Sequence, residues 1–229
     1  MFRKLLTILG IGLSNASAAE SVPPFSPFEN PAANTIYNLL FCDDLSAFRA
    51  KAGQSQTSWQ AILFGDPASM ADLKALAADL SQEGRIRYLA FARLREFGVP
   101  VQPKVLLGVV VEVHFDIGLD AIAAFSEGGV RYVNHSGKLV VVEGVATFRP
   151  IVERLFSASE PVVAQIGVWQ KARRPPPSVE SVRLTFLLSD GLTFGEGPLP
   201  VMQQDPMAGP ILSEAHELMR AVFALSAEK

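Results

Sequence analysis

The feature that most constrains the fold of this chain is a change in the spacing of its apolar residues near Gly98. Before this point, apolar side chains recur every three or four residues, as they do on one face of a helix. After it, the segment 105–143 contains four β-rich runs separated by short turns. Runs of this kind that are joined by glycine-containing turns are typical of β-hairpins. The chain is therefore predicted to begin with helices and to continue with adjacent strands.

Helical spacing covers three segments before Gly98. The first segment is 36–48, and the second, 70–80, follows Ser69, a residue type that favours the N-cap position of a helix. The third, 86–97, ends at Gly98, as expected of a helix C-terminus. We expect a helix in each of these segments.

The second half of the chain adds one more hairpin and further helices. The dipeptide 190–191, Asp-Gly, lies between two β-rich runs and is the strongest hairpin signal in the sequence. Helical spacing recurs at 148–158, at 161–167 and near the C-terminus, within 211–223. We therefore predict an α+β fold with an N-terminal helical segment, a central antiparallel sheet built from hairpins, and helices packed mainly on one face.

The N-terminal region divides into two segments that precede the domain. Residues 1–19 have a basic start, an apolar run and a small-residue site, the layout of a secretory signal peptide. They also fit a short amphipathic leader, because the apolar run is short, and both interpretations stay open. Residues 20–31 are rich in proline, which fixes φ and lacks an amide donor, so they predict a linker. Residues 32–229 are then a single α+β domain.

The composition excludes several classes of function. The chain has 20 Lys and Arg against 23 Asp and Glu, a net charge of −3, which argues against a nucleic-acid binder. No apolar run approaches the ~20 residues that span a bilayer. The single cysteine, Cys42, excludes an internal disulfide, and the adjacent Asp43 and Asp44 disfavour a reactive thiolate. Phosphate-loop, dinucleotide and hydrolase motifs are missing, so no cofactor is predicted.

The turn lengths predict which side chains share a face of the sheet. We assume two-residue turns at 127–128 and 136–137 and a three-residue turn at 117–119. This register leaves an apolar patch between charged groups on the face away from the helices. The patch consists of Ile122, Val133 and Val140. An apolar patch with a charged rim is typical of a surface that binds a partner or a small ligand.

The same register gathers polar side chains at the loop end of the sheet. The candidate catalytic residues are Asp116, Asp120, His135 and Lys138. Two carboxylates beside an imidazole can hold a divalent cation or perform acid–base chemistry. The candidate metal ligands on one strand are Glu112, His114 and Asp116. A solvated strand end produces the same patterns without any such function, so both explanations stay open.

Four stretches of the sequence resemble a family of uncharacterised bacterial proteins. They are 36–43, 106–113, 131–138 and 188–198, and the resemblance covers residues 30–229. It implies no activity, ligand or catalytic residue. Members of that family have a short, variable N-terminus without an evident secretory signal. The resemblance therefore favours the cytoplasm, whereas cleavage after residues 1–18 would imply a periplasmic or secreted protein.

The sequence is best explained by a non-enzymatic module that binds a ligand or a protein, or assembles with other copies. This hypothesis rests on the missing catalytic motifs and on the predicted apolar patch. Its partner is an unknown protein or small molecule, and a homo-oligomer stays open. The alternative is a metal-dependent or acid–base enzyme that uses the cluster of Asp116, Asp120, His135 and Lys138. Whether the chain is an enzyme stays open, although the sequence favours a protein without enzymatic activity.

Overall fold

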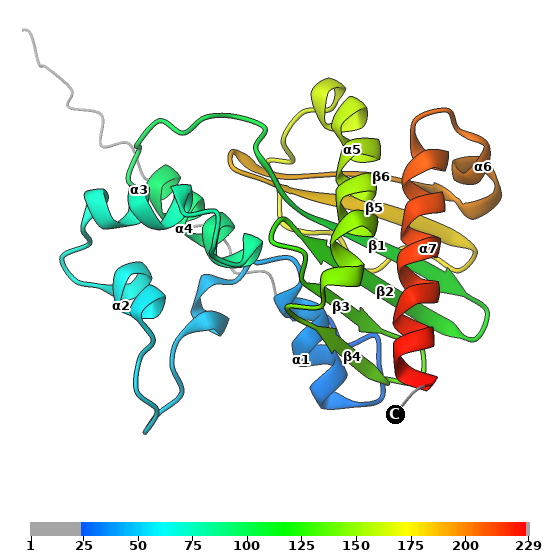
Figure 1. Cartoon of the computed structure of the whole chain (residues 1–229), viewed down its shortest axis with the longest axis horizontal. Helices are drawn as coiled ribbons and strands as arrows, with labels where there is room; N and C mark the ends of the chain where they lie inside the picture. Colours follow the sequence, from blue (N-terminus) through cyan, green and yellow to red (C-terminus); the bar gives the residue numbers. More distant parts are fainter. Residues whose placement is uncertain (1–23, 228–229) are drawn as a thin grey trace, which may run out of the picture.

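The computed structural model describes residues 24–227, which form an antiparallel sheet flanked by helices (Figure 1). The strands are β1 (Leu106–Phe115), β2 (Gly118–Phe125), β3 (Val130–Val133), β4 (Leu139–Val142), β5 (Ser181–Leu188) and β6 (Gly191–Pro198). They form one six-stranded sheet in the order β4-β3-β2-β1-β5-β6. The predicted α+β class and the antiparallel sheet of hairpins are confirmed.

The predicted segments 70–80, 86–97 and 211–223 each form one helix, with ends within a few residues of those expected. The segment 36–48 is instead divided between a helix that ends at Leu39 and a short 3-10 helix, and most of 148–158 and 161–167 lies in one continuous helix. The helices at 58–64 and 199–204 are not among the predicted segments.

The helices are α1 (Pro31–Leu39), α2 (Ser58–Phe64), α3 (Met70–Ala78), α4 (Gly84–Glu96), α5 (Arg149–Gln165), α6 (Leu199–Gln204) and α7 (Ala208–Ala227), with two short 3-10 helices, η1 (Leu45–Phe48) and η2 (Ala146–Phe148). The Ser69 side chain caps α3 by accepting a hydrogen bond from the amide of Asp72. Gly98 follows α4 with a φ of +71°, which glycine tolerates best.

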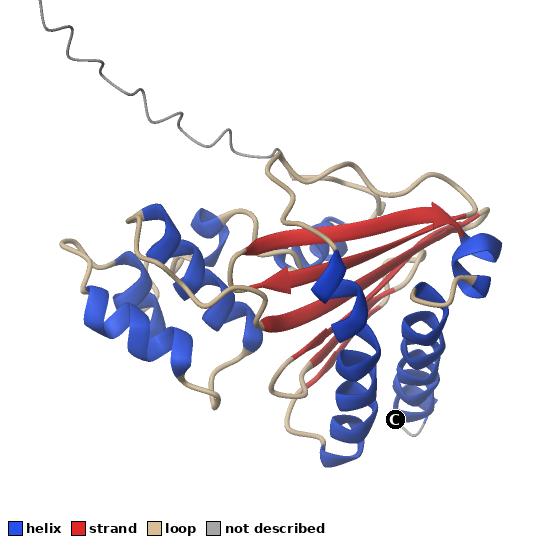
Figure 2. Ribbon diagram, turned by 90° about the horizontal axis from the view of Figure 1, so that it is seen from above, coloured by secondary structure: helices blue, strands red, loops and turns tan. Residues whose placement is uncertain are grey.

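The two longest helices, α5 and α7, pack side by side across one face of the sheet (Figures 1 and 2). Their apolar stripes contact a buried cluster that includes Val111, Ile122 and Tyr132 from the central strands. Most of the apolar residues predicted for the C-terminal helix, including Ile211 and Leu218, belong to this cluster. Apolar burial on this face is the main force that attaches the C-terminal half of the chain to the sheet.

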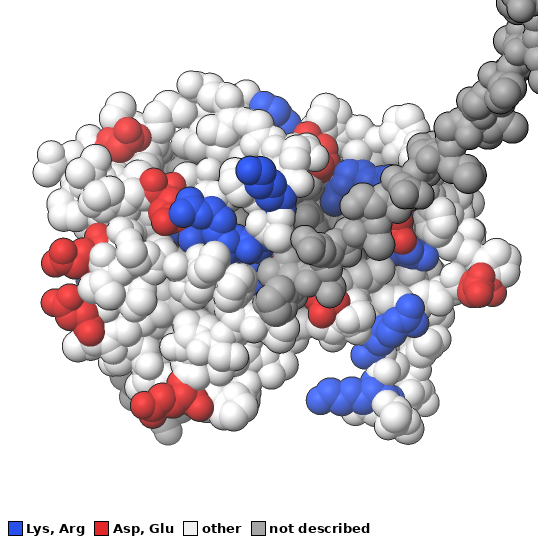
Figure 3. Space-filling model, turned by 180° about the vertical axis from the view of Figure 1, so that it is seen from behind, with Lys and Arg blue, Asp and Glu red and all other residues white. Residues whose placement is uncertain are grey.

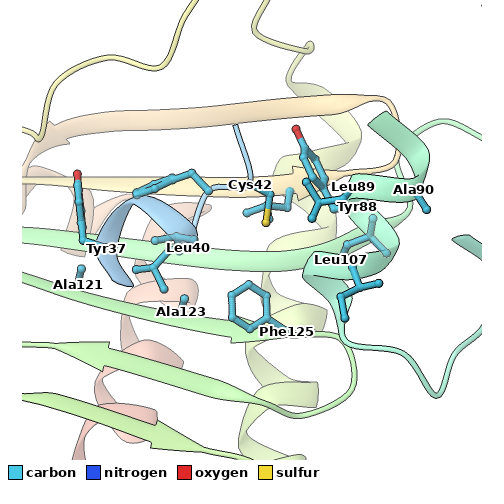
Figure 4. Packing of buried hydrophobic residues seen from close by; sticks show 14 of the residues in the cluster. Tyr37, Leu40, Cys42, Tyr88, Leu89, Ala90, Leu107, Ala121, Ala123 and Phe125 are labelled. Carbon is cyan, nitrogen blue, oxygen red and sulfur yellow. The ribbon is translucent and has the colours of Figure 1, made fainter. Parts of the chain in front are cut away.

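The opposite face of the sheet is covered by the N-terminal part of the chain. Tyr37 and Leu40, in and just after α1, lie over Ala121 and Ala123 of β2 (Figure 4). The same cluster extends to α3 and α4, which stand with α2 beyond one end of the strands (Figure 1). Both faces of the sheet are therefore buried by other parts of the chain.

Three of the predicted hairpin registers are wrong by an odd number of residues. The β2–β3 and β3–β4 loops contain three residues, 126–128 and 135–137, instead of two. Each loop ends in a glycine of positive φ, Gly128 or Gly137, as is common in three-residue hairpin loops. The β1–β2 turn is tighter than predicted, since Phe115 pairs with Gly118. An odd shift turns a strand over, so residues predicted to share a face are separated.

The predicted apolar patch is consequently not formed. Ile122 pairs with Val111 and Tyr132 and contacts the α5–α7 cluster, whereas Val133 lies in the cluster on the opposite face. Ile122 is 2% exposed and Val133 is 0% exposed. The β5–β6 hairpin, by contrast, is confirmed, although its turn lies at 189–190, one residue before the predicted pair 190–191, because Leu188 pairs with Gly191.

The predicted linker extends one residue too far, because Pro31 is the first residue of α1, whereas residues 24–30 have no helix or strand but contact α1. The amide of Phe25 donates to Asn38 Oδ1 at 3.0 Å, and that of Phe28 donates to Asn34 Oδ1 at 2.9 Å. Phe28 is buried. The predicted leader, residues 1–19, lies outside the described residues. Within residues 24–227, none of the helices combines the length and the apolar character needed to cross a membrane.

Replacing Leu218 by Ala should lower the free energy of unfolding by about 2–5 kcal/mol, because this fully buried α7 side chain would leave a cavity against the sheet. Urea denaturation followed by circular dichroism measures the change. The control Leu80→Ala removes a side chain that is 75% exposed, and it should change the free energy by less than about 0.5 kcal/mol. Equal losses in the two variants would contradict the packing of α7 on the sheet.

Candidate functional site

Two of the four candidate catalytic residues contact each other, Asp120 on β2 and His135 in the β3–β4 loop. Asp120 Oδ1 accepts a hydrogen bond from the His135 amide at 2.8 Å and lies 3.2 Å from His135 Nδ1. Asp120 Oδ2 accepts a hydrogen bond from the Tyr132 hydroxyl at 2.7 Å. Both carboxylate oxygens are thus used to hold the loop and its imidazole in place. The imidazole itself stays partly accessible, with 35% of the side chain exposed.

The other two candidates, Asp116 and Lys138, are exposed. Asp116 lies in the tight β1–β2 turn, and Lys138 precedes β4. Among residues 24–227, no hydrogen bond or ion pair joins either side chain to Asp120 or His135. The structure therefore provides a carboxylate–imidazole pair in place of the predicted four-residue cluster.

The three candidate metal ligands on β1 have separate surroundings. Glu112 is fully buried and accepts a hydrogen bond from the Tyr37 hydroxyl at 2.6 Å. His114 Nδ1 lies 2.7 Å from the carbonyl oxygen of Pro177, and Asp116 is exposed in the turn. Within the part of the chain that the structure describes, no three His, Cys, Asp or Glu side chains form a group that could hold a metal ion.

Glu112 instead belongs to a buried polar network that sequence analysis did not find. It pairs across the sheet with Arg183 of β5, whose Nη1 lies 3.6 Å from Glu112 Oε2. Arg183 Nε also donates to Glu196 Oε2 at 2.8 Å. Burial, which outweighs the opposing effect of Arg183, raises the pKa of Glu112, and burial beside Glu112 raises the pKa of Tyr37. The sequence signal that could have indicated this network is one charged residue within each of two largely apolar strands, Glu112 in β1 and Arg183 in β5.

Arg173 attaches the loop before β5 to α1. Its Nε donates to Asp43 Oδ2 at 2.6 Å, and its Nη2 donates to Asn38 Oδ1 at 2.8 Å. The guanidinium carbon lies 4.0 Å from the centre of the Phe41 ring and 4.8 Å from that of Phe25, both within cation–π range. Arg173 also contributes to the wall of a cavity of about 410 Å³ beside α1, here named the α1 cavity.

Cys42 is buried just after α1. The side chain is 4% exposed and lies in the cluster under α1 (Figure 4). Burial raises the pKa of the Cys42 thiol, which disfavours the thiolate needed for nucleophilic attack.

An exposed apolar surface lies where β1 ends, around the β1–β2 turn. We name it the hairpin-tip patch, and it consists of Phe115, Asp116, Ile117, Glu180, Pro198, Leu199 and Pro200, which line a hollow of about 570 Å³. Ile117 is 70% exposed and Phe115 39%. Val179, next to Glu180 in the chain, is also largely exposed. Exposed apolar side chains gathered in one place mark interaction surfaces.

Charged side chains of both signs are interspersed on the face seen from behind in Figure 3. Neither sign of charge dominates the visible part of this face. Comparisons with known proteins add no further assignment. Neither a family model, nor a curated protein, nor a solved structure matches the chain.

Replacing Glu112 by Gln should change how stability depends on pH. Because the pKa of Glu112 is raised in the folded state, ionisation favours the unfolded chain as the pH rises above about 4.3, the usual pKa of a glutamate. The free energy of unfolding of the wild type should therefore fall, relative to that of Glu112→Gln, between pH 4 and pH 7.

Urea titrations at intervals of one pH unit measure this difference, with circular dichroism at each pH confirming that both proteins are folded. A wild-type advantage that grows with pH would show that the ionised carboxylate is the favoured form, contrary to this assignment.

Proposed function

We propose that this protein is a non-enzymatic module that binds a partner protein through the hairpin-tip patch. The observation that carries the proposal is the exposure of Ile117 at the tip of the β1–β2 turn, next to Phe115 and the hollow beside it. Keeping large apolar side chains in water is unfavourable unless a partner covers them. We assign binding to the hairpin-tip patch and not to the predicted apolar patch, because other parts of the chain bury Ile122 and Val133.

The charges of the patch indicate the kind of partner. Asp116 and Glu180 are the charged side chains that line the hollow, and both are acidic. A partner that offers an apolar anchor side chain beside Lys or Arg would fill the hollow and pair with these carboxylates. Such complementarity favours one partner over others more than it increases affinity.

The backbone around the patch is held in place before any partner binds. The amide of Glu180 donates to the carbonyl of His114 at 2.7 Å, and the amide of Leu199 donates to the carbonyl of Glu180 at 2.9 Å. Three segments that are distant in sequence are thus joined at one site. A surface that is already ordered loses little conformational entropy on binding, which supports a role in recognition.

The enzymatic alternative has less support. Asp120 uses both carboxylate oxygens within the protein, on Tyr132 and His135. Asp116 and Lys138, which the alternative also requires, make no polar contact with this pair among the described residues. The exposed imidazole of His135 is the feature that would have to carry any such chemistry.

Selection of 12-residue peptides from a random display library on the wild-type protein should enrich sequences with an apolar anchor flanked by Lys or Arg. Ile117→Ser should weaken their binding by about tenfold or more, because it removes the most exposed apolar side chain of the patch. Glu180→Gln should weaken the binding by a smaller factor and reduce its dependence on salt. Fluorescence anisotropy of a labelled peptide measures these changes.

The matched control is Leu80→Ser, which removes a similarly exposed apolar side chain outside the patch and should leave peptide binding unchanged. Enriched peptides that are acidic, or that bind Ile117→Ser as tightly as the wild type, would overturn the proposal. Sedimentation of the wild type and Ile117→Ser identifies a second copy of the chain as the partner if only the wild type associates.

A further inference from the structure

The α1 cavity lies apart from the hairpin-tip patch and involves other residues. It is formed by α1, by the 3-10 helix η1 and by the chain at 24–26. Its volume of about 410 Å³ lies within the range of cavities that bind small molecules, roughly 300–1,000 Å³. The cavity therefore has the size of a ligand site, and the chemistry of its wall decides which ligand fits.

Much of the wall is apolar and includes two aromatic rings. Phe25 and Phe48 contribute the rings, and Leu39, Pro24 and Pro31 contribute aliphatic surface. This surface would cover the apolar body of a ligand. The Phe25 ring already contacts the Arg173 guanidinium, so Phe48 is the ring whose partial negative charge is left to attract a ligand cation.

The neutral polar side chains that α1 contributes to the wall already have partners within the protein. Asn34 exchanges two hydrogen bonds with the backbone of Phe28. Asn38 accepts from the Phe25 amide and donates to the Phe25 carbonyl. The Thr35 hydroxyl donates to the carbonyl of Pro31. Selectivity for a ligand must therefore come largely from the charged groups.

The charged groups leave two carboxylate oxygens of the wall free to accept hydrogen bonds from a ligand. Asp43 compensates Arg173 through Oδ2, which leaves Asp43 Oδ1 without a partner among the described residues. Asp44 accepts two hydrogen bonds from Ser46 on Oδ1, which leaves Oδ2. One arginine against two aspartates gives the lining of the cavity a net negative charge. The guanidinium charge of Arg173 offsets one of the two carboxylates, and its Nη1 is buried without a hydrogen-bond partner among the described residues.

We propose that the α1 cavity binds a small organic ammonium ion with an apolar body. The ammonium group would donate hydrogen bonds to Asp43 Oδ1 and Asp44 Oδ2, and the apolar body would lie against Phe25 and Phe48. Charge-assisted hydrogen bonds and aromatic faces together favour a cation over an anion or a neutral analogue.

Three probes of the same shape test this proposal on the full chain: 2-phenylethylammonium, 2-phenylethanol and phenylacetate. Ligand-observed NMR titration should give saturable binding of the ammonium probe with a Kd below about 10 mM, a range that a probe of this size can reach. The alcohol should bind at least about fivefold more weakly, since it lacks the charge-assisted hydrogen bonds. Phenylacetate should bind most weakly of the three.

Asp44→Asn separates the charge of the site from its fold. Asn keeps a side-chain oxygen that can accept from Ser46, so η1 retains its cap, while the negative charge is lost. The variant should bind the ammonium probe about fivefold or more weakly and should reduce its preference over the alcohol. The matched control is Asp79→Asn, because Asp79 makes the same pair of hydrogen bonds with Ser81 outside the cavity, and this variant should bind as the wild type does.

Phenylacetate binding as tight as that of the ammonium probe would overturn the proposal and assign the cavity to anions through Arg173. So would the absence of saturable ammonium binding up to about 10 mM, or equal effects of Asp44→Asn and Asp79→Asn. None of these three results would affect the proposal for the hairpin-tip patch, because Ile117 and Glu180 lie outside this cavity.

Discussion

The organisation of the molecule depends on a glutamate carboxyl group buried at the centre of its sheet. Glu112 on β1 is fully buried, and an isolated buried carboxyl group is costly unless polar partners reach it. Its partners come from two directions, Tyr37 on α1 and Arg183 on β5. Removing either partner would leave the other groups buried and unpaired. The Glu112 contacts therefore tie the N-terminal helix to this face of the sheet and specify where α1 lies.

This constraint determines where binding can occur. With α1 and its neighbours on one face and with α5 and α7 on the other, the central strands offer no open surface within the described chain (Figures 1 and 2). Binding sites for a partner or a ligand can therefore lie only at the edges of the helical layers that cover the sheet. One is the hairpin-tip patch around Ile117, and the other is the α1 cavity between α1 and η1. The two sites differ in chemistry, since the patch presents exposed apolar side chains and the cavity encloses carboxylates and aromatic rings.

The sequence predicts the elements of this fold better than their registers. Apolar spacing and caps such as Ser69 are local signals, so α3 and α4 are placed within a few residues. Register depends on whether a loop has two or three residues, and a glycine such as Gly128 or Gly137 fits both. The contact of Glu112 with Tyr37 spans 75 residues, and no local pattern encodes it. The sequence correctly predicts that Asp120 and His135 lie close together. It misplaces the apolar surface, because that prediction depends on the exact register.

The most direct test of the account is a map of backbone amide shifts in the full chain on addition of a peptide with an apolar anchor flanked by lysines. Binding at the hairpin-tip patch predicts the largest shifts at residues 115–118, 179–180 and 198–200. Smaller shifts are expected at residues 134–138, because His135 lies next to Gly118 of the hairpin. Shifts centred on Asp120 and 134–138, with the hairpin tip unchanged, would contradict the account and direct attention to the His135 imidazole as the functional group.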